Sequence, residues 1–562
     1  MPPYVSETFT AEEAAILRRY VTNLDRPVFA LVNLPEVVKG ALFARYSRSS
    51  KSLRRLFLDE FVGDLDVSGD VTVDATVGLH RAQELYRRVF LEYGDDSVAQ
   101  LGGVHLACEQ SSNLLTKVLE RSRLMSYLEQ STRYIGYDSR LATGHYRYYR
   151  PPEILDSSLG ARYVGDMDRM FDTYADLLPR VQAWVATHHP RDPADSDFVH
   201  RQAVRAKALD AVRGLLPSAA LSNVGVYGTG QSYELLLVHM RTHPLPEARQ
   251  YAELMLEELR KVIPSFLERV DRPDRGGEWS TYLASTREAM TRTTADLWPD
   301  AAGGALLPSV SNEVEPTAVS GVTLLDFDPD GEDKVVAAAC FPSTSLPEPE
   351  ILRRVRALGA DDRVQILKTY VGDRRNRRHR PGRAFERTGY RFEIVSDYGA
   401  FRDLQRHRML TAEWQELTTG LGWESSEVVE EAGLLGPYTE SLARSKELHA
   451  ALLTHFPAQA AYAVALAFRI RFVLQMNARE AMHVIELRSG PQGHPAYRRI
   501  AQQLHRAIDQ TAGHHAIAAA MAYVDHQDVT LERLGAERRA EARRSVSGAG
   551  GQTGNPQLSD QG

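Results

Sequence analysis

Cysteine is scarce in this sequence of 562 residues, which contains only Cys108 and Cys340. Two cysteines can form neither the disulfide framework of a small secreted domain nor a zinc site with several cysteine ligands. Cys340 lies in the apolar run AAACFPS, where a small buried side chain is a better interpretation than a nucleophile. The sequence therefore gives no sign of a structural disulfide or of a cysteine-bound zinc ion.

Long apolar runs are also lacking, because no uninterrupted stretch reaches the length that crosses a membrane. The first residues, MPPYVSETFTAEEAAILRRY, have neither the basic start nor the apolar core of a secretion signal. We therefore expect a cytoplasmic protein that contacts no membrane.

Neither sign of charge is in large excess. Lysine and arginine together number 67, and aspartate and glutamate together number 74, which gives a net charge of −7. This balance argues against a general nucleic-acid binder, which would carry a strongly positive surface. Any anion-binding site must therefore be local.

The chain is long enough for two to four domains. The first half is mostly helical in pattern: TAEEAAILRRYV begins at Thr10, a capping residue, and PLPEARQYAELMLEELRKVIPSFL has helical spacing that stops at Pro264. In the second half, AVSGVTLLDFDPDGEDKVVAAAC predicts two strands about the turn DPDGED. Further on, the spacing of Tyr398, Phe401 and Leu404 predicts a helix.

The two halves of the chain resemble each other. LERSRLMSYLEQ in the first half matches LQRHRMLTAEWQEL in the second, and each places Arg-x-Arg on a predicted amphipathic helix before a hydroxyl residue, Ser126 or Thr411. AVRGLLPSAALSNVGVYGTGQSYELLLVHMR likewise resembles HFPAQAAYAVALAFRIRFVLQMNAREAMHVIELR. Self-similarity at this scale indicates a duplicated domain.

Together, RSRLMSYLEQSTRY and RHRMLT resemble the signature of the flavin-dependent thymidylate synthases, in which Arg-His-Arg precedes Ser, Glu, Ser, Arg and Tyr at fixed offsets. The first half keeps this signature except for Ser122, which stands where the family has His. The second half keeps Arg-His-Arg and lacks the later Glu, Ser and Arg. The matching positions are Arg121, Arg123, Ser126, Glu129, Ser131, Arg133 and Tyr134 in the first half, and Arg406, His407 and Arg408 in the second.

A later segment of the family pattern is clearest in MNAREAMHVIELRSGPQGH, where Asn477, Arg479, Arg488 and His494 match. Asn477 and Arg488 are eleven residues apart, which is about three helical turns. They therefore share one face of a predicted helix.

The first half has no Asn in the corresponding segment, although Arg241 matches the arginine at its end. It does keep Arg213, which matches the family's arginine four residues before a proline, here Pro217. The second half has Leu453 before Pro457 instead. The two halves have therefore lost complementary parts of the family pattern.

The resemblance implies an α+β fold made of two tandem copies of a flavin-dependent thymidylate synthase-like domain, helix-rich and with a small antiparallel sheet in each. Gly- and Pro-rich composition near residue 300 and low apolar content near the end mark the boundaries. We expect a first repeat over residues 1–305, a linker over 306–316, a second repeat over 317–546 and a disordered tail over 547–562. Because family sites lie between subunits of a tetramer, the resemblance also implies a homodimer that mimics this tetramer.

The implied activity is the reductive methylation of dUMP to dTMP, with FAD as cofactor and with methylenetetrahydrofolate and NADPH as co-substrates. The flavin carries the redox chemistry, and the protein supplies orientation and electrostatics. No enzyme cysteine attacks the pyrimidine in this family, which agrees with a chain that has only two cysteines. We expect no bound metal ion.

The resemblance assigns the site to both repeats. Guanidinium groups and hydroxyls suit a nucleotide phosphate, and a cation near the uracil would stabilise the charge that develops when its C5 attacks an electrophile. The expected substrate-binding residues are Glu129, Gln130, Ser131, Arg133, Arg213 and Arg488, of which Ser131, Arg133 and Arg488 are the catalytic candidates. The expected cofactor-binding residues are Ser97, Arg406, His407, Arg408, Asn477, Arg479 and His494.

Two other interpretations are open. The basic segment 374–383 could bring a uracil in RNA to a flavin- and folate-dependent site, although it has no interleaved aromatic residue and a solvated loop is the simpler interpretation. Losses in both halves also fit a degenerate relative that binds flavin or nucleotide in a structural or regulatory role. The histidines of HHAIAAAMAYVDHQD match no strong metal-site spacing.

Overall fold

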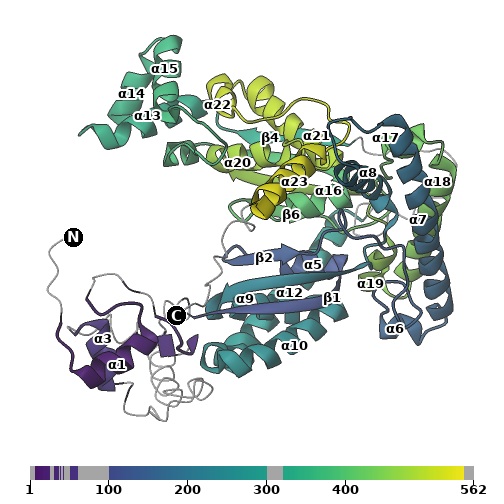
Figure 1. Cartoon of the computed structure of the whole chain (residues 1–562), viewed down its shortest axis with the longest axis horizontal. Helices are drawn as coiled ribbons and strands as arrows, with labels where there is room; N and C mark the ends of the chain where they lie inside the picture. The colour runs from purple at the N-terminus through teal and green to yellow at the C-terminus, as the bar shows by residue number, and fades with distance from the viewer. Residues whose placement is uncertain are drawn as a thin grey trace, which may run out of the picture. The chain divides into compact units, whose positions relative to one another are not determined.

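A computed structural model describes residues 7–25, parts of 29–62, residue 100, and residues 102–299 and 320–549 (Figure 1). The predicted linker over 306–316, Ser97 and residues 550–562 lie outside the described residues. The chain forms two compact units: Met1–Ser111, Val118–Glu129 and Asn223–Pro299 make the first, and Ser112–Lys117, Gln130–Ser222 and Asp300–Gly562 make the second. Residues 130–222 of the first predicted repeat therefore pack in the same unit as the second repeat.

The first unit contains a three-stranded sheet with its last strand in sequence at the centre, in the order β1-β3-β2. The predicted helix after Thr10 is confirmed, and Thr10 and Glu13 form a capping box. The predicted helix that stops before Pro264 is also confirmed. The elements are α1 (Ala11–Tyr20), α3 (Leu53–Glu60), β1 (Gly103–Ser112), β2 (Met125–Glu129), β3 (Leu221–Thr229), α9 (Gly230–Arg241), α10 (Pro246–Val262) and α12 (Glu278–Leu297).

The second unit contains a four-stranded antiparallel sheet in the order β4-β5-β7-β6. Its strands are β4 (Gly321–Phe327), β5 (Gly389–Asp397), β6 (Thr411–Trp414) and β7 (Arg469–Asn477). Its main helices are α5 (Asn113–Leu119, shared with the first unit), α7 (Gly160–His188), α8 (Asp197–Val212), α13 (Gly331–Cys340), α15 (Ala360–Val371), α16 (Tyr398–Leu404), α18 (Leu435–Leu453), α20 (Ala478–Arg488), α21 (Pro495–Arg506) and α23 (Leu534–Ala549). The helix predicted from Tyr398, Phe401 and Leu404 is α16.

The two sheets repeat one pattern, which confirms the predicted tandem copies. The order β1-β3-β2 in the first repeat corresponds to β5-β7-β6 in the second. The register corresponds as well, because Ser126 of β2 faces Tyr227 and Thr411 of β6 faces Gln475. A side-chain cap follows the third strand of each set, from Thr229 onto α9 and from Asn477 onto α20.

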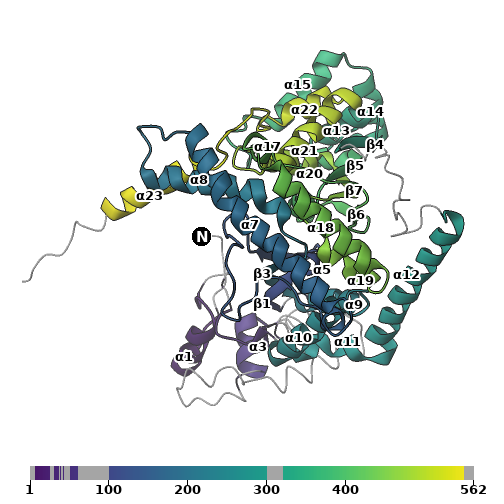
Figure 2. The ribbon, with the colours of Figure 1, turned by 90° about the vertical axis from the view of Figure 1, so that its right-hand side faces the viewer.

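Segments of the two repeats also meet around a local two-fold axis inside the second unit. The amide of Ser218 donates to the carbonyl of Val464 at 2.8 Å, and the amide of Leu466 donates to the carbonyl of Leu216 at 2.9 Å. Leu466 corresponds to Ser218, and Val464 to Leu216, so each bond is the counterpart of the other. The long helices α7 and α18, one from each repeat, pack side by side in the same unit (Figure 2).

One predicted strand pair is wrong. The segment AVSGVTLLDFDPDGEDKVVAAAC forms the single strand β4, a turn, and then the helix α13. Glu332 and Asp333 stand in the first turn of α13, where carboxylates favour a helix, and the alanines that follow have high helix propensity. Val335 and Val336 are buried, and they belong to this helix and not to a strand.

The two Arg-x-Arg motifs do not lie on helices, which corrects a second prediction. In each repeat the helix ends first, at Leu119 or Leu404, and the motif occupies the turn that leads into the next strand. Pairing of β2 with β3 and of β6 with β7 places the following residues in sheets. Local apolar spacing cannot show such pairing between segments distant in sequence.

No helix among the described residues is both long and apolar enough to span a bilayer.

Candidate functional site

Arg133 joins the two repeats within the second unit. Its Nε and Nη2 donate to the two carboxylate oxygens of Asp210, in the last turn of α8, at 2.7 and 2.6 Å. Its Nη1 donates to the hydroxyl of Tyr497, on α21, at 3.0 Å. The Arg133 amide in turn donates to Oγ of Ser131 at 3.2 Å, which fixes the local turn. A side chain of the first repeat thus contacts a helix of the second.

A second carboxylate, Asp403 near the end of α16, lies among three more guanidinium groups. Arg213, from the short helix after α8, places Nη1 at 3.7 Å from one carboxylate oxygen. Arg488, the last residue of α20, places Nη1 at 3.8 Å from the other, which also accepts a hydrogen bond from Arg406. Two of the four arginines come from each repeat.

The electrostatics of this arginine cluster (Arg133, Arg213, Arg406 and Arg488) are strongly positive. Burial alone would raise the pKa of Asp403, but the cluster outweighs burial and lowers that pKa below its usual range. Asp210 behaves in the same way, with Arg133 as the main opposing charge, so its pKa is also lowered. Four guanidiniums therefore face two fully ionised carboxylates, an imbalance that suits an anion.

Arg213 gives the clearest sign of a ligand group. Its side chain is only 5% exposed, and its Nη2 atom is buried without a hydrogen-bond partner in the described part of the chain. Gly399 permits this approach, because a Cβ atom there would lie 3.1 Å from that nitrogen. Asp397 also faces Arg213, and burial raises the pKa of Asp397. A cavity in the second unit is lined by Arg213, Asp210, Asp397, Tyr438 and His494 among others.

Sequence reasoning missed Tyr497, Asp210 and Asp403. The centre of the Tyr497 ring lies 5.9 Å from the Arg133 guanidinium carbon and 5.5 Å from that of Arg488. One signal was available for the carboxylates, because Asp210 precedes Arg213 by three positions and Asp403 precedes Arg406 by three. No comparable signal marks Tyr497.

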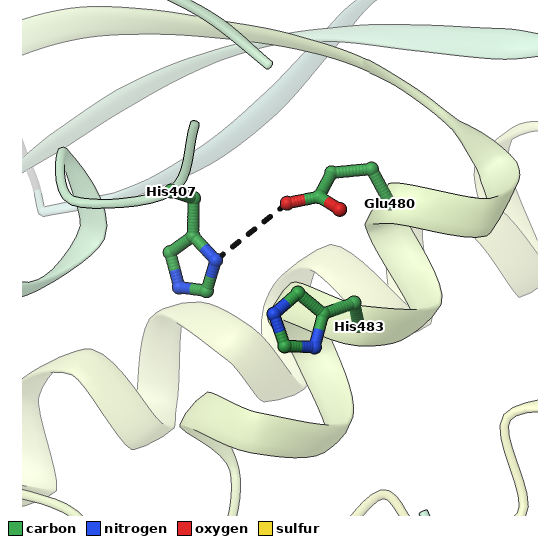
Figure 3. Close-up of side chains that lie close together, drawn as sticks. All are labelled: His407, Glu480 and His483. Carbon is green, nitrogen blue, oxygen red and sulfur yellow. Dashed lines mark ion pairs between the residues drawn. The ribbon is translucent and has the colours of Figure 1, made fainter. Parts of the chain in front are cut away.

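A second cluster adjoins Arg488 and consists of His407, Glu480 and His483 (Figure 3). Nε of Arg488 donates to Nε2 of His407 at 2.9 Å, and Nδ1 of His407 lies 3.7 Å from a carboxylate oxygen of Glu480. Nη2 of Arg380 contacts Nδ1 of His483 at 2.9 Å. The imidazole rings of His407 and His483 meet edge to face, with their centres 5.4 Å apart.

These three residues offer ligand atoms within 4.8 Å of one another, a set that a divalent metal ion could use. The surrounding charges disfavour this use. Arginine can only donate hydrogen bonds, and both histidines contact an arginine through one ring nitrogen. The other nitrogen of each neutral ring must then carry the proton, so it has no lone pair for a metal. The two histidines are therefore better described as hydrogen-bond acceptors for Arg488 and Arg380 than as metal ligands.

The remaining predicted residues fall into three groups. Asn477 caps α20 by accepting from the amide of Glu480 at 2.9 Å, and His494 caps α21. Arg479 is part-exposed and contacts the carbonyl of Pro381 and the carboxylate of Glu386. Of the others, Gln130 accepts from Arg147, Glu129 ends β2 in the first unit, Arg408 is exposed and Ser97 lies outside the described residues.

His494 is neutral in this setting. Burial, together with Arg213 and Arg133, lowers the pKa of His494 well below its usual range. Its Nε2 contacts the carbonyl of Asp210 at 3.2 Å, and its Nδ1 accepts from the amide of Ala496. The flavin-binding role of His494 remains a prediction, as do the roles of the other predicted site residues.

The basic segment 374–383 is only partly a solvated loop. Arg374 is buried and forms a two-bond ion pair with Glu486, at 2.7 Å for each bond. The hydroxyl of Tyr523 donates to the carbonyl of Arg374 at 2.6 Å. Arg375, Arg378 and Arg380 are exposed. The segment is thus anchored at its start and presents cations beyond it.

The histidines of HHAIAAAMAYVDHQD do not converge on one point. His514 contacts the Tyr390 hydroxyl, His515 contacts Asp509, and His526 contacts His505. They form no joint metal site within the described residues.

A family model for the thymidylate synthase complementing protein matches residues 42–265 and again residues 323–512. The two matches fall on the two repeats. This agrees with the duplicated sheets described above.

Similar proteins span nearly the whole chain. A UPF0159 protein of Chlamydia muridarum is 38% identical over 540 residues, which are 95% of this chain and 99% of that protein. A UPF0159 protein of Thermoplasma acidophilum is 32% identical over 528 residues, 89% of this chain and 98% of its own length. A flavin-dependent thymidylate synthase of Clostridium tetani is 24% identical over 182 residues, 32% of this chain and 67% of its own.

Proposed function

Since the chain belongs to the family of thymidylate synthase complementing proteins, we propose that it is an FAD-dependent thymidylate synthase with one nucleotide site composed from both repeats. The reaction is the reductive methylation of dUMP to dTMP, in which methylenetetrahydrofolate gives the carbon unit and NADPH the reducing equivalents. The arginine cluster is the observation that carries this proposal.

The charge of the cluster supports a phosphate monoester as ligand. Four guanidiniums set against two ionised carboxylates leave an excess of positive charge, and a phosphate monoester carries nearly two negative charges at neutral pH. Arg213, with its buried unpartnered nitrogen, and Arg133, from the signature EQSTRY, are the residues that hold the phosphate. Ser131, two positions before Arg133, adds a hydroxyl, and Gln130 lies next to it in the second unit. A role of Glu129 stays a prediction.

Arg488 acts on the pyrimidine. Burial lowers the pKa of Arg488, but a guanidinium stays protonated in proteins, so it is a fixed cation. Its Nε is held by His407, and its terminal nitrogens, one of which also lies near Asp403, stabilise negative charge on a uracil carbonyl while C5 attacks the one-carbon electrophile. The proton at C5 is released to solvent when the carbon unit is attached.

The residues near α20 fit the anionic part of a flavin dinucleotide. Three arginines from separate segments lower the pKa of Glu480: Arg380, Arg408 and Arg479. Three guanidiniums therefore lie near this one carboxylate. Such a set suits a pyrophosphate. Arg406, His407 and Asn477 adjoin it in the second unit, and FAD would supply the redox chemistry there when bound.

Release of tritium from [5-³H]dUMP in the presence of FAD, methylenetetrahydrofolate and NADPH tests the proposal. We expect release that depends on all three compounds. Protein that binds FAD and dUMP yet releases no tritium would support the second candidate, a binding protein without turnover. The loss of family residues in each repeat is the observation that favours that candidate.

We also propose a homodimer. The contacts around the local two-fold axis let one chain supply an interface that two single-domain subunits would otherwise form, so two chains would equal a family tetramer. Light scattering of the flavin-loaded protein at micromolar concentration should give about twice the mass of one chain, 62.8 kDa. A monomer that retains flavin and activity would contradict the dimer.

A further inference from the structure

Glu480 and His483 have no part in the predicted site, yet they adjoin its central cation. They lie three positions apart on the first turns of α20 and face His407, which comes from the turn after α16 (Figure 3). Both Glu480 and His483 have ionisable side chains; Glu480 is buried and His483 is half-buried. His407 is buried to 4% side-chain exposure and Glu480 to 8%.

Hydrogen bonding determines the protonation of His407. Nε of Arg488 is a permanent donor, so Nε2 of His407 must accept and cannot carry a hydrogen. Burial and the neighbouring Arg488, His483 and Arg406 lower the pKa of His407 well below its usual range, so the ring is neutral. Its single proton therefore sits on Nδ1, the nitrogen that faces Glu480 at 3.7 Å.

The carboxylate of Glu480 favours this tautomer. At 3.7 Å the two atoms are beyond hydrogen-bonding distance, but a negative charge there still stabilises a proton on Nδ1 relative to one on Nε2. The opposite tautomer would direct an N–H at the N–H of Arg488 and would break their contact. Arg488 would then lose one of the contacts that fix its orientation, leaving Asp403 and the Tyr497 ring.

We infer that Glu480 is a positioning residue for Arg488, which it orients through the tautomer of His407. The inference rests on the proposed function, because it deepens the role given there to Arg488. Glu480 does not touch the pyrimidine in this account.

The ionisation of Glu480 gives the inference a measurable consequence. Burial raises the pKa of Glu480 to about 7, against the opposing influence of Arg380, Arg479 and Arg408. The groups around it are His407 and Arg408 from the turn after α16, Arg380 from the loop before β5, and Arg479 and His483 on α20, with Glu386 paired to Arg479. His483 is neutral, because burial, Arg380 and Arg377 lower its pKa to about 4. Ionised Glu480 supports Arg488, so turnover should rise with pH through about 7.

The decisive variant is Glu480→Gln, assayed by tritium release from pH 6 to 9. We expect kcat to fall about tenfold to a hundredfold and to lose its rise near neutral pH, while KM for dUMP stays within about twofold. Glu532→Gln is the matched control, because Glu532 is another buried glutamate whose pKa is raised by burial and it contacts Lys207 instead. That variant should keep the rise in kcat.

A double-variant comparison separates positioning from loss of structure. Glutamine at position 407 can accept from Arg488 through its amide oxygen and has no tautomer to set. In a His407→Gln background, the further change Glu480→Gln should therefore alter kcat by less than about twofold. A loss as large as in the wild-type background would overturn the inference.

A readout independent of activity is the tautomer itself. In protein with ¹⁵N-labelled imidazole rings, the His407 signals are those that vanish in His407→Gln. At pH 8 we expect them to show a proton on Nδ1, and to shift toward the other tautomer in Glu480→Gln. A wild-type proton on Nε2, or no shift in the variant, would overturn the inference even if the enzyme is active. If the tautomer shifts but no tritium is released, the proposed function fails and the contact stands.

Discussion

The two repeats differ at three positions around the start of their corresponding helices, α9 and α20. At these three positions the second repeat has ionisable side chains, and the first has small or apolar ones. The corresponding pairs are His407 and Ser122, Glu480 and Ser232, and His483 and Leu235. In the first unit, the side chains of Ser122, Ser232 and Leu235 line a pocket together with Trp279 and Tyr282 of α12. The group that we infer to orient Arg488 therefore has no counterpart in the first repeat.

The arginine cluster shows the same asymmetry. The counterpart of Arg488, eleven residues after the helix cap, is Met240. Arg241, which the sequence suggested as the match, lies one position later and pairs with Glu253 and Asp271 instead, so that assignment was wrong. Arg133 and Arg213 correspond to Thr418 and Ala461, so the match of Arg213 to Leu453 suggested by the sequence was wrong. Of the four arginines of the cluster, only Arg406 has an arginine, Arg121, at the corresponding position.

The difference has a simple physical basis. Two identical subunits must each keep every site residue, because one sequence supplies both halves of every site. In a tandem chain with one complete site, each repeat needs only the residues that it contributes to that site. Its other site residues can be lost without loss of the site. The complementary losses in this chain are those that the proposed composite site would permit.

The largest effect should come from Arg133→Ala. Removing one member of a buried ion pair leaves Asp210 ionised and unpaired, and it also removes a phosphate contact. We expect dUMP affinity to fall by about 2–5 kcal/mol, roughly 30-fold to several thousand-fold, in calorimetric titrations. Thr418→Ala, the change at the corresponding position, should leave affinity unaltered.

Arg133→Lys is the control that shows whether misfolding causes the loss of dUMP affinity in Arg133→Ala. It keeps the charge but loses the two-bond geometry, so it should fold and still bind dUMP more weakly than the wild type. Normal affinity in Arg133→Ala would remove the first repeat from the nucleotide site.

Arg488→Ala should instead suppress turnover. We expect kcat to fall by about 10²–10³, with a smaller change in flavin content, because the cation acts on charge that develops in the transition state. Tritium release measures this. Because Arg488 and Arg133 meet at one Tyr497 ring within a single chain, mixing Arg133→Ala with Arg488→Ala protein should restore no activity. Recovery on mixing would show that the site forms between chains.

Arg406→Ala should have a smaller effect, on the flavin. Loss of one charge-assisted contact should weaken FAD binding by about 1.5–3 kcal/mol, roughly ten- to a hundredfold. Arg121→Ala is the corresponding change in the first repeat and should matter less, because Ser122 interrupts the motif there. Fluorescence titration with FAD checks both, and equal losses would contradict the asymmetry.

Much of the fold and of the candidate site could be predicted from the sequence. The cap at Thr10 and the apolar spacing in α10 and α16 are local signals, and the structure confirms them. The motifs identified the arginines that meet in the second unit. Local signals failed where pairing between distant segments decides the outcome, as in β2 and β6.

The buried counter-charges were harder to predict. Asp210 and Asp403 each stand on an otherwise ordinary helix, and only the assembled cluster shows that guanidiniums surround them. Tyr497 and Glu480 likewise gain their roles from neighbours more than 70 residues away in sequence. Such contacts depend on the packing of both repeats in one unit.

The number of dUMP molecules bound per chain tests the central claim most directly. Isothermal titration of the FAD-loaded protein should give one dUMP per chain, and none in Arg133→Ala at the same concentrations. Two molecules per chain would show that the counterpart position binds nucleotide as well, and would contradict the account of one composite site.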